Sequence, residues 1–226
     1  VSLHKGVDAT KDQTYFLALL RQQQASHALF PIGDFLTSDV REVARRFALP
    51  NAEKKDSQGI CFIGEVKMSD FLRSYVPDKP GDIVNHEGKV VGKHKGLHLY
   101  TLGQRKGLGV ASNTYKEAYV VIEKRHATNE LIVAFDRPDT PGLYAIRCKV
   151  GSISVVNQAL SEASSLQARP RYRTKAIDIK VEDSGPKGLE VEFSKPQRAL
   201  TPGQICAFYD GEILMGGGVF ERIDPI

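Results

Sequence analysis

The stretch QICAFYDGEILMGGGVF, residues 204–220, predicts a β-hairpin. Two apolar runs, 204–209 and 212–220, flank Asp210-Gly211, and an Asp-Gly pair in that position is a strong signal for a two-residue turn. The three glycines at 216–218 indicate a β-bulge or a close crossing of two chain segments. This stretch therefore predicts an antiparallel sheet.

Further short apolar runs precede the hairpin at similar intervals. They lie at 145–150, 153–156, 172–181 and 189–193. Evenly spaced short strands separated by turn residues are typical of a small antiparallel barrel, so we expect a β-barrel over residues 143–226. We expect the segment 157–167, which is rich in Ser, Ala and Gln, to be a loop.

Residues 67–142 predict a second, β-rich central domain. A short helix over 69–75 ends before Pro77, and Pro80-Gly81 marks a turn. The strand-like runs that follow lie at 83–85, 89–92, 97–102, 118–125 and 131–135. Pro141-Gly142 then indicates a boundary before the barrel.

Residues 1–66 predict two helices followed by a cysteine-containing loop. Thr10 and Gln13 fit a capping box, which predicts a helix over 8–27. Apolar residues with helical spacing predict a second helix that begins at Thr37 or Ser38. Because no strand partner precedes these helices, we expect the tail of an α/β domain. The predicted fold class is thus mixed α/β and β, with this helical tail, a β-rich central domain and a C-terminal antiparallel barrel.

Composition excludes several classes of protein. A net charge of +4 with a pI near 8.9 is compatible with nucleic-acid binding without demonstrating it. No run of about 18 apolar residues is present, so we expect no membrane partner. Three widely spaced cysteines and six dispersed histidines argue against a disulfide framework and a metal site, and they fit a reducing cytoplasm.

The segment KKDSQGICFIG, residues 54–64, places Cys61 between β-branched and aromatic residues, closed by glycines. Glycines permit sharp turns that present a thiol, and Lys54 and Lys55 would favour the nucleophilic thiolate. The alternative is a buried structural cysteine in a short apolar strand. The residues alone leave both interpretations open.

Five strings resemble the tRNA-specific 2-thiouridylases in content and order. They are KDQTYFL (11–17), KKDSQGICFIG (54–64), YTLGQRKGLG (100–109), TPGQICAFYDGE (201–212) and MGGGVFER (215–222). The resemblance implies that 1–66 ends an adenine nucleotide alpha hydrolase-like catalytic domain. It also implies sulfur transfer to C2 of the wobble uridine, with Cys61 as the persulfide carrier, a sulfur-relay protein as donor and ATP as cofactor.

The resemblance also implies a set of tRNA-binding residues. They are Lys11, Asp12, Gln13, Arg171, Tyr172 and Gln204. From the residues alone, 11–13 also fit a solvated helix start. The segment RPRYR, 169–173, places three guanidinium groups near one aromatic ring, which suits phosphate and base contacts, although alternating outward residues of a strand give the same pattern.

The ATP-binding motif of the family, SGGxDS, does not occur in this sequence. The glycine-rich run 103–109 lacks the spacing and following helix of a phosphate-binding loop. We therefore expect a truncated chain that alone neither binds ATP tightly nor thiolates tRNA. The alternative is a shortened protein that works together with a separate subunit. Two other functions remain open: a non-enzymatic RNA-binding barrel, and a thiol redox protein, which the lack of a nearby second cysteine disfavours.

Overall fold

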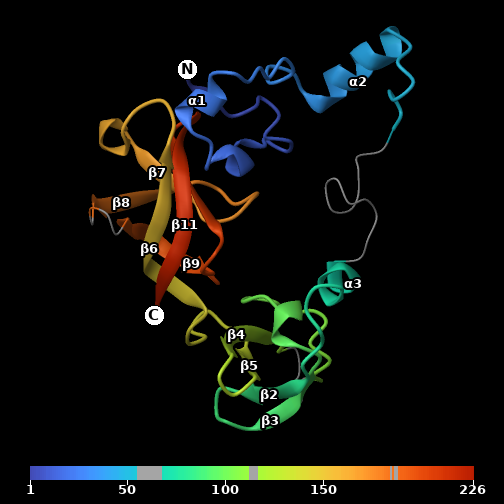
Figure 1. Ribbon diagram of the computed structural model, residues 1–226, viewed down its shortest axis with the longest axis vertical. Helices are drawn as coiled ribbons and strands as arrows, with labels where there is room; N and C mark the ends of the chain where they lie inside the picture. Colours follow the sequence, from blue (N-terminus) through green and yellow to red (C-terminus); the bar gives the residue numbers. More distant parts are fainter. Residues whose placement is uncertain (55–67, 112–116, 184, 186–187) are drawn as a thin grey trace. The chain divides into compact units, whose positions relative to one another are not determined.

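The computed structural model describes residues 1–54, 68–111, 117–183, 185 and 188–226. The chain divides into two units (Figure 1). The barrel unit comprises Val1–Lys55 and Ile146–Asp224, and the second unit comprises Asp56–Ala145 and Pro225–Ile226. None of the helices in the described ranges is long and apolar enough to cross a lipid bilayer.

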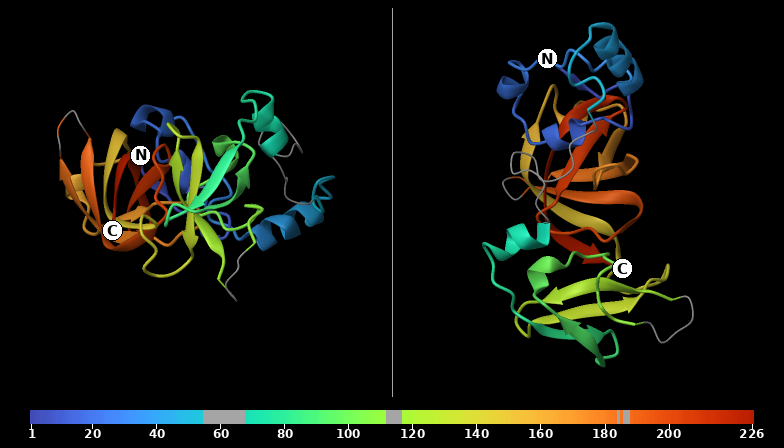
Figure 2. Two further views of the ribbon diagram at one scale, coloured as in Figure 1. Left: turned by 90° about the horizontal axis from the view of Figure 1, so that it is seen from below. Right: turned by 90° about the vertical axis from the view of Figure 1, so that its right-hand side faces the viewer.

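Six strands of the barrel unit close into a ring, seen from two further sides in Figure 2. The strands are β6 (Tyr144–Val155), β7 (Leu166–Arg169), β8 (Ile177–Asp183), β9 (Leu189–Arg198), β10 (Ile205–Asp210) and β11 (Ile213–Pro225). Their order is β11-β10-β7-β8-β9-β6, and β11 also pairs with β6. The β-barrel predicted from the spacing of apolar runs is confirmed.

The predicted Asp-Gly hairpin joins β10 to β11. Asp210 pairs with Ile213, and Gly211 takes a φ of 55°, in the left-handed region that a two-residue turn of this kind requires. A register shift between Phe208 and Tyr209 marks a bulge opposite the glycines. A Cβ on Gly217 would lie 2.8 Å from Cβ of Ala18, so the expected close crossing is also present.

Three predictions for the barrel strands were wrong. The runs 145–150 and 153–156 form one continuous strand, β6, with Ser152 at a φ of 50°. The run 172–181 contributes only its second half, because 171–174 form a turn. Part of the expected loop 157–167 belongs to β7, whose polar composition hid a strand stabilised by pairing with β10.

The second unit contains a mixed four-stranded sheet in the order β3-β2-β5-β4. The strands are β2 (Gly81–Asn85), β3 (Val90–His94), β4 (Tyr119–Arg125) and β5 (Glu130–Phe135), with β2 and β5 parallel. The helix α3 (Met68–Arg73) is close to its predicted position. Residues 97–99 form a 3₁₀ turn rather than the expected strand, which buries Leu97 and Tyr100 in the core.

The predicted helix over 8–27 is also wrong. That region contains a 3₁₀ turn, η1 (Thr14–Leu17), and a short helix, α1 (Gln22–Ala25). The Thr10 hydroxyl donates to Asp8 at 2.6 Å and makes no capping box. Short polar side chains here bond to nearby backbone groups, as Asp12 does to the Thr14 amide, and so compete with helix formation.

The second predicted helix is confirmed as α2 (Thr37–Arg46), but its cap comes from a distant residue. The Asp8 carboxylate accepts the Thr37 amide at 3.0 Å and the Thr37 hydroxyl at 2.6 Å. The hydrogen bond from the Thr10 hydroxyl, and then these two bonds from Thr37, hold the pKa of Asp8 well below its usual range. Helix α2 buries none of its side chains among the described residues, and Phe47 after it is 69% exposed.

Candidate nucleic-acid interface

The N-terminal segment covers the outer face of β10 and β11. Strand β1 (Leu3–His4) pairs with β11, and one apolar cluster joins the segment to the barrel. The cluster contains Leu3, Tyr15, Ala18, Ala25, Val156, Ala207, Tyr209 and Leu214. Because successive side chains of a strand point to opposite faces, Cys206 and Phe208 face the barrel interior. β10 is therefore buried on both faces, which explains its unbroken apolar sequence.

Asp12 lies buried within this contact. Its Oδ2 accepts a hydrogen bond from Nη1 of Arg169 at 2.8 Å. Thr14 donates to Oδ1 of Asp12 through its amide at 3.1 Å and its hydroxyl at 2.8 Å. Burial raises the pKa of Asp12, but the bonds from Thr14 and Arg169 outweigh it and lower the pKa overall. The carboxylate is thus ionised at neutral pH and directed into the protein.

Arg169 and Tyr209 extend this polar network into the barrel wall. Cζ of Arg169 lies 4.8 Å from the centre of the Tyr209 ring, within range of a cation–π interaction. The hydroxyls of Thr14 and Tyr209 lie 3.2 Å apart. Burial raises the pKa of Tyr209, so its hydroxyl keeps its proton. The network fixes the turn before η1 to strands β7 and β10.

Gln13 and Tyr172 bring the two predicted tRNA-binding segments together. Nε2 of Gln13 donates to the Tyr172 hydroxyl at 3.0 Å, although the residues are 159 positions apart. The ring of Phe16 lies 4.5 Å from that of Tyr172 and 5.5 Å from that of Tyr15. A polar and aromatic surface therefore forms where η1 meets the turn at 171–174.

Arg171 is directed into the protein. It is half-buried, and its guanidinium donates to the carbonyl of Ala199. Burial, and then the charge of Arg198, lowers the pKa of Arg171. The predicted grouping of three guanidiniums around Tyr172 is wrong: only Arg173 lies over that ring, at 5.3 Å, while Arg169 lies over Tyr209.

Lys11 and Gln204 complete the set of predicted tRNA-binding residues. Lys11 is exposed, and its amide donates to the Asp8 carbonyl at 2.9 Å, which holds the turn that precedes Asp12. Gln204 is half-buried in the 201–204 turn before β10. Its Oε1 is buried without a hydrogen-bond partner in the described part of the chain, as is Nε of Arg171.

Cys61, together with Lys55, lies outside the described residues, and Lys54 is exposed. Cys148 and Cys206 are free thiols that are fully buried. Burial raises the pKa of Cys148 to about 12, aided by the charges of Asp224 and Glu190, and it raises that of Cys206 well above its ordinary value. These two thiols are therefore unreactive in the folded protein.

Neither Phe16 nor the partners of Arg169 were predicted from the sequence. Phe16 is apolar, yet it is 54% exposed. The apolar sequence of β10 could have indicated that another segment covers its outer face, because an unbroken apolar run is typical of a strand buried on both faces. Nothing in the sequence specifies that Asp12 is the residue that meets Arg169.

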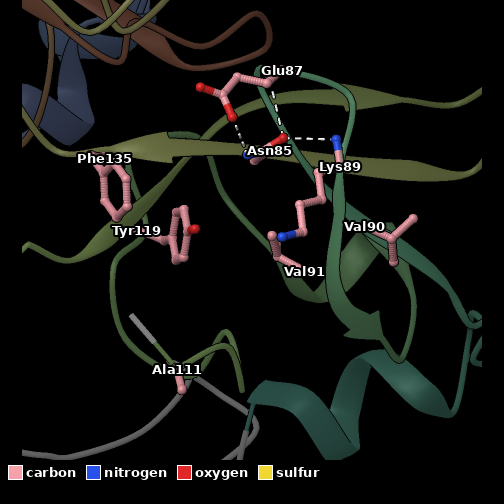
Figure 3. A pocket seen from close by; sticks show the side chains of 8 residues that line it. All are labelled: Asn85, Glu87, Lys89, Val90, Val91, Ala111, Tyr119 and Phe135. Carbon is pink, nitrogen blue, oxygen red and sulfur yellow. Dashed lines mark hydrogen bonds between the residues drawn. The ribbon is translucent and has the colours of Figure 1, made fainter. Parts of the chain in front are cut away.

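The second unit contains a cavity of about 300 Å³ (Figure 3). It is lined by Asn85, Glu87, Lys89, Val90, Val91, Ala111, Tyr119 and Phe135. Asn85 bonds to Glu87 and to the Lys89 amide, and the rings of Tyr119 and Phe135 stack at 4.7 Å. The Asn85 side chain is thus occupied by bonds to its neighbours, and we assign no ligand to the cavity.

The glycine-rich run 103–109 does not form a nucleotide cradle, and no metal cluster is found among the residues with described positions. In the glycine-rich run 103–109, Gln104 bonds to Thr101 and Lys106, and Arg105 pairs with Asp136 at 3.2 Å. A Cβ on Gly109 would meet nothing within 4 Å, so no close backbone approach requires glycine there. No group of three His, Cys, Asp or Glu side chains is suitably placed for a metal ion in the described ranges.

Comparison with known proteins matches three domain families along the chain. Residues 1–65 match the tRNA methyl transferase HUP domain, and residues 69–135 match the tRNA methyl transferase PRC-barrel domain. Residues 146–220 match the aminomethyltransferase beta-barrel domain. Together, the three matches cover most of the chain and follow one another without overlap.

Several curated relatives are named tRNA-specific 2-thiouridylase MnmA. The protein of Akkermansia muciniphila is 52% identical over 221 residues, which are 98% of this chain and 61% of the relative. Those of Pseudomonas fluorescens and Ralstonia pickettii are 43% and 44% identical over 99% of this chain, covering 60% and 61% of their own lengths. The chain thus spans about three fifths of the relatives it matches. By these domain matches and this shared sequence, the chain belongs to the tRNA-specific 2-thiouridylase family.

Proposed function

We propose that this chain is the tRNA-binding and sulfur-carrying part of an enzyme that replaces the C2 oxygen of the tRNA wobble uridine with sulfur. The hydrogen bond between Gln13 and Tyr172 is the observation that supports tRNA binding most strongly. It joins two segments, 159 positions apart, that the family resemblance independently assigns to tRNA.

The predicted tRNA-binding residues divide into two roles. Lys11, Gln13 and Tyr172 present a cation, an amide and an aromatic ring, which suit phosphate, base-edge and base-stacking contacts. Asp12 acts as a positioning residue, because its buried carboxylate holds the turn against the barrel. Arg171 and Gln204 are half-buried, and a contact of either residue with RNA would use the part of its side chain that stays exposed.

Cys61 is proposed as the sulfur carrier, loaded as a persulfide by a sulfur-relay protein. A covalent carrier divides one difficult substitution at C2 into easier steps. The free, buried states of Cys148 and Cys206 support this assignment, because neither thiol is accessible to a donor protein. We place the reaction in the cytoplasm, where thiols stay reduced.

ATP is the cofactor that the resemblance implies, and the glycine-rich run 103–109 does not fit it. The side chains of Gln104 and Arg105 in the run 103–109 bond within the protein. We therefore derive no step through ATP. The proposed organisation remains a helical catalytic-domain segment at 1–66, a central domain at 67–142 and a tRNA-binding barrel at 143–226.

Sulfur loading separates this proposal from a non-enzymatic RNA-binding module. The chain is incubated with a low-molecular-weight persulfide donor, digested and examined by mass spectrometry, with Cys61→Ser as the matched control. We expect one added sulfur on Cys61 and none on Cys148 or Cys206, while both proteins bind tRNA equally. A chain that binds tRNA but gains no sulfur on Cys61 would favour the module.

A further inference from the structure

We infer that Phe16 and Arg173 form a stacking site for one unpaired base of the RNA, beside the surface made by Lys11, Gln13 and Tyr172. This inference rests on the proposed function, because it names residues and a ligand chemistry that the tRNA-binding proposal leaves open. The site takes a single-stranded nucleotide rather than a duplex. Neither residue is among those that the family resemblance assigned to tRNA.

Phe16 is an exposed aromatic ring held in a fixed position. It is 54% exposed, and its amide donates to the Gln13 carbonyl at 3.0 Å within η1. Its ring packs edge-on against the buried Tyr15, at 86°, and lies at 49° to that of Tyr172. The neighbouring Tyr15 hydroxyl donates to the Ile205 carbonyl at 2.8 Å. The ring is therefore supported from beneath, while about half of it faces solvent.

Arg173 supplies the exposed cation of the 171–174 turn. The turn is closed by bonds from the Thr174 amide and hydroxyl to the Arg171 carbonyl, at 3.2 and 2.7 Å. Arg173 takes a φ of 64°, a left-handed conformation that is uncommon for a residue with a side chain. Its guanidinium lies 5.3 Å from the Tyr172 ring, whereas that of Arg171 turns inward to Ala199.

Phe16 and Arg173 both contact Tyr172, and Phe16 is the more exposed of the two aromatic residues. Tyr172 is half-buried, it contacts Phe16 and Arg173, and its hydroxyl accepts from Gln13. Phe16 offers an exposed ring for stacking, and the planar guanidinium of Arg173, which lies over the adjoining Tyr172 ring, suits both stacking and phosphate binding. Successive bases stack on such exposed aromatics in proteins that bind single strands. A duplex offers no base face to this surface.

The chain contains no tryptophan, so a single substitution creates a specific optical probe. Phe16→Trp keeps an aromatic ring at the site, and Leu29→Trp provides a matched control at a position that is 92% exposed. We expect a tRNA transcript to quench the indole emission of the Phe16→Trp variant in a saturable manner and to leave that of the control unchanged. A fully paired RNA of the same length should not quench the Phe16→Trp emission.

Affinity measurements complete the test. We expect Phe16→Leu, which keeps the apolar volume, to weaken tRNA binding about tenfold without changing its salt dependence, and Phe16→Tyr to retain affinity. Arg173→Ala should lower the slope of log affinity against log salt by about one. Unchanged affinity in Phe16→Leu, with tRNA still bound by the unmodified chain, overturns this inference alone. Failure of the unmodified chain to bind tRNA overturns the proposed function and this inference together.

Discussion

Nη1 of Arg169 lies 2.8 Å from Oδ2 of Asp12, across 157 positions of sequence. The Asp12 and Arg169 side chains are only 4% and 18% exposed, so this ion pair is largely desolvated. Removing one partner of a buried pair leaves an uncompensated charge, which is strongly destabilising. The pair therefore stabilises the contact between the N-terminal segment and the barrel more strongly than an exposed ion pair would.

We expect Arg169→Met to lower the free energy of unfolding by about 3 kcal/mol, because it leaves the Asp12 carboxylate buried and unpaired. Urea denaturation measures this loss. The double variant Asp12→Asn/Arg169→Met should recover part of it, since no buried charge remains. Strictly additive effects of the two substitutions would contradict the coupling.

The lowered pKa of Asp12 predicts a specific pH dependence of stability. Because the folded pKa lies below the unfolded value, the unfolded state binds more protons between the two, and stability falls as pH falls. The contribution is complete above the ordinary carboxyl pKa of about 4 and is lost progressively below it. Comparing unfolding free energies of the natural chain and Asp12→Asn from neutral to acidic pH checks this. A difference that stays constant as pH falls would argue against it.

Gly217→Ala should destabilise the barrel unit by about 1–3 kcal/mol, the usual cost of overpacking. The added Cβ would lie 2.8 Å from Cβ of Ala18 and 2.7 Å from the Cys206 carbonyl oxygen. Gly6→Ala is a matched control, because the nearest atom to its Cβ would be 3.7 Å away. Thermal unfolding of both variants gives the comparison, and equal melting temperatures would contradict the close crossing.

Alkylation of the folded chain should label Cys61 well before the other thiols. Cys148 and Cys206 are fully buried, and burial raises both of their pKa values, so little reactive thiolate forms at neutral pH. Time-resolved iodoacetamide labelling with peptide mass spectrometry measures the three rates. Labelling of Cys148 as fast as Cys61 would be inconsistent with the buried thiols described above.

The barrel was predictable from the sequence because its signals are local. The Asp-Gly turn, the glycines at 216–218 and the spacing of apolar runs each report on neighbouring residues. Strand β7 and the N-terminal turns were not predictable, since they depend on partners far along the chain. Leu166–Arg169 becomes a strand by pairing with β10, and Asp12 meets Thr14 and Arg169 instead of entering a helix.

The candidate interface was likewise predictable from the sequence only in part. Family resemblance predicted Lys11, Gln13 and Tyr172 as tRNA-binding residues, but it gave no orientation to their side chains. Only the folded chain shows Asp12 and Arg171 directed inward, because their neighbours Arg169 and Ala199 come from distant segments. Exposure of Phe16 likewise results from the way η1 lies on the barrel, which helical periodicity does not describe.

The central claim is that segments 11–13 and 171–172 form one tRNA-binding surface, and a salt series of tRNA binding tests it most directly. We expect saturable binding, a salt slope lower by about one in Lys11→Ala, and about tenfold weaker binding with an unchanged slope in Tyr172→Ala. Lys180→Ala, an exposed lysine of β8, is the matched control and should bind like the natural chain. The claim would be contradicted if Lys11→Ala and Tyr172→Ala both bound tRNA as tightly as Lys180→Ala does and with the same salt slope.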